Sequence, residues 1–244
     1  MRTASNFGQL GDRPSHPDLL DYLAGRFIKS GWSFKALHRD IMLSRVYQLS
    51  SAMDRRNFEI DGDNEYLWRM HRRRLDVEPW RDAMLAVSGS LDYSLGGPST
   101  DLNDAANRRR TVYAKISRHR LNELLRLFDF PDPNITSAER TRTTVPLQQL
   151  FVLNSEFMIR RAKALAARLL EQSGFSDVER IERAYILVYG RPATQNELDT
   201  GRAFLRTATV VDKTASVKDT SERLTNWEQY SLALLSSNEF LFVD

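Results

Sequence analysis

The sequence predicts a mainly α-helical protein, an irregular multi-helix bundle with at most a short β element around residues 111–116. Three observations predict this fold. Apolar residues recur every three or four positions along most of the chain, capping residues precede many of these stretches, and glycine or proline follows them. With 41% apolar and 27% charged residues among 244, the chain has the composition of a globular protein with a core.

Two helices are predicted near the start of the chain. Ser15 is expected to cap the first helix, with Pro17 in its first turn and Gly31 at its end. Ser33 is expected to cap the second helix. Because the connection is short, we expect the two helices to pack as an antiparallel pair. The polar stretch 51–63 carries no period and predicts a loop.

A third helix is predicted to begin at Asp76, whose carboxylate can cap it, and to reach Leu91. Glycines and a proline then predict a mobile loop over residues 96–110. The following stretch, residues 111–116, is β-prone but has no obvious partner strand, so it predicts only a short strand.

Helical periodicity continues through the middle of the chain. A short helix is predicted over residues 121–128, and the Pro- and Asp-rich stretch 130–134 predicts a turn. A long helical pattern then covers residues 144–169. The polar pair at residues 154–155 in its middle predicts a break there.

The last third carries the clearest helix boundaries. Ser176 is expected to begin a helix that Gly190 ends, and Thr194 with Glu197 has the spacing of a capping box for the next one. The polar stretch 207–221 predicts a linker or a long loop.

A final helix is expected after this linker, with Asn226 and Gln229 as capping residues. We therefore expect a main helical part over residues 1–175 and a C-terminal helical subdomain over residues 176–244.

Charge and residue content restrict the classes of function. Thirty-five Lys and Arg against 32 Asp and Glu leave a net charge of +3, so bulk charge does not indicate nucleic-acid binding. The chain has no Cys, which excludes disulfides, thiolate zinc sites and the attachment motif of a c-type haem in this chain. The four His are scattered without the spacing of a zinc motif. We expect no metal or cofactor in this chain.

One group of polar residues is the candidate site. Glu78 and Asp82 stand four apart on one helix face, as acid/base chemistry or a divalent ion could use, but neighbouring arginines favour an ion-pair network with Arg74 and Arg81 instead. Oxygen ligands in the later turn lack the spacing of a calcium loop. The full candidate cluster is Arg74, Glu78, Arg81, Asp82, Asp129, Asp132, Asn134 and Arg140.

Two runs of arginine, at residues 69–74 and 108–110, allow a second interpretation. They could form a phosphate or sugar-acid site, because guanidinium groups bind such anions in bidentate fashion. Nucleic-acid binding through these runs is the weaker alternative, since aromatic stacking platforms are not interleaved with them.

Several ordered motifs together resemble one family. They are Ser15-His16-Pro17-Asp18, Arg73-Arg74-Leu75 with Arg81-Asp82-Ala83, Phe128-Asp129-Phe130-Pro131-Asp132-Pro133-Asn134, Thr143-Thr144-Val145-Pro146, Tyr189-Gly190-Arg191-Pro192 and Ser237-Asn238-Glu239-Phe240. The chain resembles the planctomycete secreted domain-one family, a domain of unknown function (number 1553). The resemblance implies a large exported parent with a sister domain and often a c-type cytochrome module upstream. It implies no catalytic residues.

The family pattern enters midway near the start of this chain, so the resemblance implies a C-terminal portion of a longer protein. It implies a periplasmic or extracellular parent, whereas this chain carries no export signal or membrane span and would stay cytoplasmic if produced as given. The expected function is that of a helical module acting with upstream cytochrome-linked domains, its expected partners, and possibly with polysaccharide. The alternatives are a hydrolase or carbohydrate-binding domain and, more weakly, a nucleic-acid binder.

Overall fold

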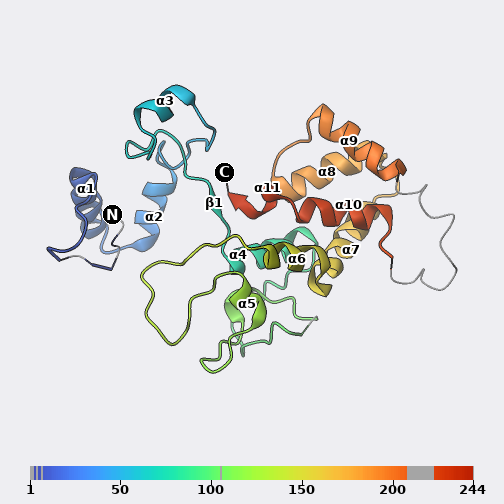
Figure 1. Ribbon diagram of the computed structural model, residues 1–244, viewed down its shortest axis with the longest axis horizontal. Helices are drawn as coiled ribbons and strands as arrows, with labels where there is room; N and C mark the ends of the chain where they lie inside the picture. Colours follow the sequence, from blue (N-terminus) through green and yellow to red (C-terminus); the bar gives the residue numbers. More distant parts are fainter. Residues whose placement is uncertain (1–2, 4, 7, 105, 208–222, 244) are drawn as a thin grey trace. The chain divides into compact units, whose positions relative to one another are not determined.

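A computed structural model describes residues 3, 5–6, 8–104, 106–207 and 223–243. The chain divides into two compact units, one that extends to Arg73 and one that comprises Arg74–Val243. Helices dominate both units, which confirms the predicted mainly α fold (Figure 1). The boundary expected between residues 175 and 176 falls inside the second unit and stays a prediction.

The first unit contains α1 (Pro17–Lys29), α2 (Phe34–Met42) and α3 (Arg55–Ile60). The N-cap of α1 is His16, so the predicted Ser15 cap is wrong; with Pro17 as the first helical residue, Ser15 stands one position too early. Gly31 follows the end of α1 with φ +70°, and the hydroxyl of Ser33 accepts a hydrogen bond from the Ala36 N–H at the start of α2. Both predictions are confirmed.

The first unit has little buried apolar surface. None of the described residues of its three helices is buried, and Leu20 and Phe34 are 52% and 67% exposed. An aromatic contact, with the ring centroids of Phe27 and Phe34 5.1 Å apart, and an ion pair of 2.6 Å between Arg26 and Asp40 connect α1 to α2. A unit of this size buries a smaller fraction of its surface than a larger one does.

The second unit is built around one central helix, α7 (Glu156–Leu170), which packs against its neighbours on several sides. The neighbours of α7 are α4 (Val77–Val87), α6 (Pro146–Asn154), α8 (Asp177–Tyr189) and α10 (Asn226–Leu235). The remaining elements are β1 (Arg73–Arg74), the 3₁₀ turn η1 (Thr111–Tyr113), α5 (Glu123–Leu127), α9 (Gln195–Thr207), α11 (Asn238–Leu241) and β2 (Phe242–Val243).

The core of the second unit follows from the apolar periodicity of these helices. Leu165 and Leu169 of α7 are completely buried, and Trp80 of α4 and Leu235 of α10 are 1% exposed. Trp80 stacks on Phe128 with 4.6 Å between the ring centroids. The apolar faces of helices far apart in the sequence therefore form one continuous core.

Helix boundaries in the second unit agree with most predicted caps. Ser155 separates α6 from α7 and caps α7, and Gly190 ends α8 in the left-handed region with φ +72°. Ser176 caps α8, and the hydroxyl of Thr194 accepts a hydrogen bond from the Glu197 N–H. These four predictions are confirmed.

The cap of the final long helix differs from the prediction. Thr225 caps α10 in a capping box with Glu228, and Asn226 is the first helical residue. The side chain of Asn226 instead donates to the carbonyl of Leu205. The predicted linker over residues 207–221 lies outside the described residues, except for Thr207 at the end of α9.

Residues 111–116 stay within the predicted limit of at most a short β element, but they form no strand. Thr111–Tyr113 form the 3₁₀ turn η1, and Ala114 makes an isolated bridge to Thr100. The reason is Asp82, whose carboxylate accepts hydrogen bonds from both the N–H and the hydroxyl of Thr111 at 2.7 and 2.6 Å. The strand pairing in the second unit instead joins β1 and β2.

The loop expected to be mobile is connected to this turn through Arg109. The Arg109 guanidinium stacks 4.1 Å from the ring of Tyr113 and donates to the carbonyls of Gly96 and Pro98. These contacts give the loop a defined path, and its mobility stays a prediction. None of the helices in the described ranges has the length and the apolar character needed to cross a membrane.

Candidate functional site

The eight predicted site residues all lie in the second unit, where they are divided among four separate contacts. Arg74 contacts Asp129, Glu78 contacts Arg140, and Arg81 and Asp82 both contact Thr111. Asp132 and Asn134 contact each other. Two partnerships, Arg74 with Asp129 and Glu78 with Arg140, connect residues that are 55 and 62 positions apart in the sequence.

Arg74 and Asp129 form the most buried ion pair of the four contacts. Their side chains are 6% and 14% exposed, and Arg74 Nη2 lies 2.6 Å from Asp129 Oδ2. Arg74 Nη1 donates to Gln148 Oε1 at 3.0 Å and to the carbonyl of Thr143. Asp129 also accepts hydrogen bonds from the N–H and the hydroxyl of Thr143. The pair thus holds the segment before α6 against the end of β1.

The charge of Asp129 is stabilised by these contacts. Burial raises the pKa of its carboxyl, but the hydrogen bonds from Thr143 and Arg74 outweigh burial, so the pKa lies below its ordinary value. Asp129 is therefore a carboxylate at neutral pH.

Glu78 binds Arg140 through both carboxylate oxygens, at 2.7 and 2.8 Å. The prediction that Glu78 pairs with Arg74 and Arg81 is wrong, because its partner is Arg140. Arg74 lies in β1, before the helix begins, and the Arg81 side chain points into the core, so the three residues do not share a helix face. The guanidinium of Arg140 also lies 5.3 Å from the ring of Phe130.

The pKa of Glu78 is lowered as well. Burial raises the pKa of this carboxyl, and the hydrogen bond from Arg140 with a backbone hydrogen bond more than offsets the effect of burial. Glu78 is thus held ionised in the same manner as Asp129.

Arg81 is 1% exposed, and its guanidinium binds backbone carbonyls of the loop before η1. Its Nη1 donates to the carbonyl of Arg109 at 3.0 Å and its Nη2 to the carbonyl of Asn107 at 2.9 Å. Burial lowers the pKa of Arg81 to about 10, although the nearby Asp82 opposes this effect. Asp82 lies 3.6 Å from Arg110, so its charge is also balanced.

Asp132 and Asn134 form a local turn. Asp132 Oδ1 accepts hydrogen bonds from the N–H and the side-chain amide of Asn134, both at 2.9 Å, and that amide also donates to the carbonyl of Arg118. This is the usual use of Asp in a Pro-rich turn. Within the described ranges, no cluster of three or more His, Asp or Glu side chains is arranged to hold a metal ion.

These contacts bear on what the predicted cluster can do chemically. A glycoside hydrolase needs one carboxyl group with a raised pKa to protonate the leaving group. The pKa values of Glu78 and Asp129 are both shifted the other way, and each carboxylate is bound by an arginine. Two of these contacts fasten a loop or turn to α4, the pair of Arg74 and Asp129 holds the segment before α6, and Asp132 with Asn134 stabilises a turn.

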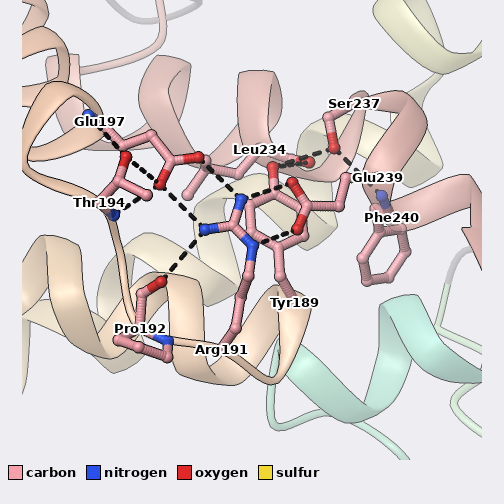
Figure 2. A network of polar contacts seen from close by, with 9 residues as sticks. All are labelled: Tyr189, Arg191, Pro192, Thr194, Glu197, Leu234, Ser237, Glu239 and Phe240. Atoms are coloured by element: carbon pink, nitrogen blue, oxygen red, sulfur yellow. Dashed lines mark hydrogen bonds and ion pairs between the residues drawn. The ribbon is translucent and has the colours of Figure 1, made fainter. Parts of the chain in front are cut away.

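A further polar network, which the sequence analysis missed, connects the turn after α8 to α11 (Figure 2). Arg191 binds both oxygens of Glu197, at 2.8 and 2.9 Å, and both oxygens of Glu239, at 2.6 and 2.8 Å. Hydrogen bonds from Arg191 lower the pKa of Glu197 to about 2. The capping box at Thr194 signals one partner, but only the fold brings Glu239 to the same guanidinium.

Tyrosine side chains flank this network. The guanidinium of Arg191 lies 5.4 Å from the ring of Tyr185, and the hydroxyl of Tyr189 contacts the carbonyl of Leu234 and the hydroxyl of Ser237. Burial raises the pKa of Tyr189 to about 12. Both tyrosines are therefore neutral at physiological pH and act as packing and hydrogen-bonding groups.

Arg161 of α7 differs from the buried Arg74 and Arg81, whose guanidinium groups donate to side chains and carbonyls. It is 8% exposed, and its Nε and Nη1 have no hydrogen-bond partner among the described residues. Its guanidinium lies 5.8 Å from the ring of Phe157, and that of Arg81 lies 5.5 Å from the same ring. Burial, followed by the charge of Arg108, lowers the pKa of Arg161. This buried cation is incompletely compensated.

The fold and these contacts define a mainly α-helical domain whose charged side chains chiefly hold loops and turns to helices. Residues 1–205 match the family described as PSD1, a protein of unknown function (DUF1553). The chain belongs to this family, which confirms the resemblance found in the sequence. The curated proteins and the solved structures contain no match to it.

Proposed function

We propose that this chain is an interaction module of a large exported bacterial protein and works together with other domains of the same polypeptide. The proposal rests on one observation: charged side chains of the predicted cluster are bound to one another or to loop backbone. Glu78 and Asp129 are each bound by an arginine, and Arg81 is bound to loop carbonyls. Side chains engaged in this way support a rigid scaffold rather than acid/base chemistry.

Membership of the family supports the wider context of the proposal. The sequence resemblance implies an exported parent that often carries a c-type cytochrome module upstream. In such a parent the haem would belong to the upstream module, because this chain has no Cys to attach it. The partners of the chain are then the neighbouring domains, and polysaccharide is the candidate substrate of the assembly as a whole.

Cell fractionation of the native organism tests whether the chain belongs to a larger exported protein. An antibody raised against the purified chain should detect a polypeptide clearly larger than 28.2 kDa in the exported fraction, and this band should stain for covalent haem. A 28 kDa band confined to the cytoplasm would contradict the proposal.

An activity assay tests the role of the chain itself. The purified chain, incubated with a set of neutral and acidic polysaccharides, should release no more reducing ends than its Glu78→Gln and Asp129→Asn variants. If the wild-type chain turns over a polysaccharide and either substitution abolishes that turnover, the chain is a hydrolase and the module proposal is wrong. Salt-dependent binding of RNA or DNA would favour the arginine runs as a nucleic-acid surface instead.

A further inference from the structure

The side chain of Arg161 in α7 carries a positive charge that the described part of the chain does not balance. The residue is 8% exposed, and its Nε and Nη1 are enclosed without a hydrogen-bond partner among the described residues. Burial, followed by the charges of Arg108 and Arg160, lowers the pKa of Arg161, and both of these charges are positive. Buried charges in proteins are normally paired, because an unpaired ion loses its hydration without compensation. Arg161 therefore lacks a negative partner.

The third nitrogen of this guanidinium, Nη2, gives access to the charge. It makes no hydrogen bond to the described residues, and unlike Nε and Nη1 it is not an enclosed atom. The Nη2 atom thus keeps accessible surface, and an ion can reach it from solvent. A bound anion would contact Nη2 and would leave the two enclosed nitrogens out of reach.

Arg108 is a second cation near this position. Arg81 donates to the backbone carbonyls of the residues on either side of Arg108, at 2.9 and 3.0 Å. The guanidinium groups of Arg81 and Arg161 lie 5.5 and 5.8 Å from the ring of Phe157. These contacts hold the backbone of Arg108 and the side chain of Arg161 in the same part of the second unit. The Arg108 side chain is exposed and has no ion-pair or hydrogen-bond partner among the described residues.

The carboxylates that share an open cleft with Arg108 do not pair with it. Asp92 and Asp104 line this cleft. Asp92 accepts a hydrogen bond from the N–H of Ser94 at 2.9 Å, and Asp104 accepts one from the N–H of Ala106 at 2.8 Å. Within the described ranges neither carboxylate forms an ion pair with Arg108. The charge of Arg108 therefore stays available to a ligand.

These charges determine the class of ligand. Two unpaired guanidinium groups supply two positive charges, and a phosphate group carries about −1.5 to −2 at neutral pH. Guanidinium groups bind phosphate oxygens through short, charge-assisted hydrogen bonds. We propose that Arg161 and Arg108 together form a binding site for one tetrahedral dianion, the chemical class of inorganic phosphate and phosphate monoesters. Arg161 Nη2 donates to one oxygen of the ligand, and the Arg108 guanidinium donates to the others.

Other anions fit this site less well. A carboxylate or a phosphodiester brings a single negative charge and leaves one of the two guanidinium groups without a partner. The site is also independent of the proposed module function, because both arginines lie in the second unit and no other domain is needed. Failure of the phosphate test would therefore leave the module proposal unchanged.

Isothermal titration calorimetry of the full chain at pH 8, in a phosphate-free buffer of constant ionic strength, tests the proposal. Inorganic phosphate should bind saturably with one site per chain, and acetate should bind at least about tenfold more weakly, as expected from the loss of a charge-assisted hydrogen bond. Methyl phosphate distinguishes the two sources of the dianion. An affinity at least equal to that of inorganic phosphate assigns the site to monoesters, and a weaker one assigns it to the free ion. Absence of saturable phosphate binding, or equal affinity for acetate, would overturn the proposal.

Three arginine variants assign the site to its residues. Arg161→Met and Arg108→Met should each weaken phosphate binding at least about tenfold. Arg160→Met is the matched control, because Arg160 is exposed, precedes Arg161 in α7 and pairs with Glu156. Its affinity for phosphate should stay within about twofold of the wild type, since salt screens an exposed charge. An unchanged affinity in Arg161→Met or in Arg108→Met would overturn the assignment.

Thermal unfolding separates specific binding from a general effect of salt. Phosphate should raise the melting temperature of the wild type, because a ligand that binds the folded chain stabilises it, and should leave that of Arg161→Met unchanged. Phosphate also stabilises proteins in general by exclusion from their surface. An equal rise of the melting temperature in the two proteins would show this general effect alone and would overturn the proposal.

Discussion

Arg191 and Glu239 are joined by two hydrogen bonds of 2.6 and 2.8 Å across 48 positions of sequence. The contact fastens the turn between α8 and α9 to α11, and the same guanidinium holds Glu197. One arginine thereby connects three helices of the second unit.

Replacement of Arg191 by alanine should lower the free energy of unfolding. The side chains are about one-third exposed, so each ion pair alone contributes little. Both pairs are bidentate, however, and the substitution leaves both carboxylates without their partner. We therefore expect a loss of about 1–2 kcal/mol. Urea denaturation measures it. Arg160→Ala, which removes an exposed pair with Glu156, is the control and should change stability by less than about 0.5 kcal/mol.

The pKa of Glu197 predicts an acid-sensitive contribution to stability. Folding lowers this pKa from 4.5 to about 2, chiefly through Arg191. Between these two values the unfolded chain binds the proton and the folded chain does not, so the free energy of unfolding falls as the pH drops from 4.5 toward 2. In Glu197→Gln the slope of stability against pH over this range should be smaller. Identical slopes in the two proteins would mean that Arg191 does not stabilise the Glu197 carboxylate.

Glu78→Ala should destabilise the second unit. The substitution leaves the partly buried Arg140 without its bidentate partner, and we expect a loss of about 1–3 kcal/mol in thermal or urea unfolding. Glu78→Gln should lose less, because the amide oxygen still accepts one hydrogen bond. If Glu78→Ala melts like the wild type but loses a measured ligand affinity, the site is functional rather than structural.

Arg161→Met should stabilise the chain. The substitution replaces a buried cation, two of whose nitrogens lack a partner in the described structure, by an apolar side chain of similar length, and we expect a gain of about 1 kcal/mol. Arg168→Met, about two turns further along the same side of α7, is the matched control. Arg168 Nη1 donates to the carbonyls of Ala86 and Val87 at the end of α4, so its loss should lower the melting temperature. A lower melting temperature for Arg161→Met would show that its charge is compensated.

Gly201→Ala should be tolerated poorly for steric reasons. A methyl group at this buried position of α9 would lie 2.7 Å from the hydroxyl oxygen of Tyr230 and 3.0 Å from Ile181, which predicts a loss of about 1–3 kcal/mol. Gly25→Ala in α1 meets no atom within 4 Å and should stabilise its helix by about 0.5–1 kcal/mol. Circular dichroism during thermal unfolding can follow both variants.

Local signals in the sequence predicted many local features of the fold, although the stretch 51–63, predicted as a loop, contains α3. The break at Ser155, the capping box of Thr194 with Glu197 and the left-handed Gly190 all depend on contacts within a few residues, which composition and spacing reveal. The β propensity of residues 111–116 was misleading for the opposite reason. Asp82, nearly 30 positions earlier, accepts the hydrogen bonds of Thr111 and imposes a turn there.

The candidate site also depends on contacts between residues far apart in the sequence, which local signals do not reveal. Helical spacing predicted that Glu78 would pair with arginines on its own helix, whereas its partner Arg140 is 62 positions away. Spacing rules describe neighbours on one helix and carry no information about which loop returns to it.

The packing of α10 has a practical consequence for anyone who divides this chain into pieces. The family match ends at residue 205, but Leu234, Leu235 and Phe240 lie beyond that position and are at least nine-tenths buried in the second unit. A polypeptide cut where the family match ends would lose one wall of its core and expose the apolar surface of α7. The matched stretch is therefore shorter than the stretch whose side chains pack into one core.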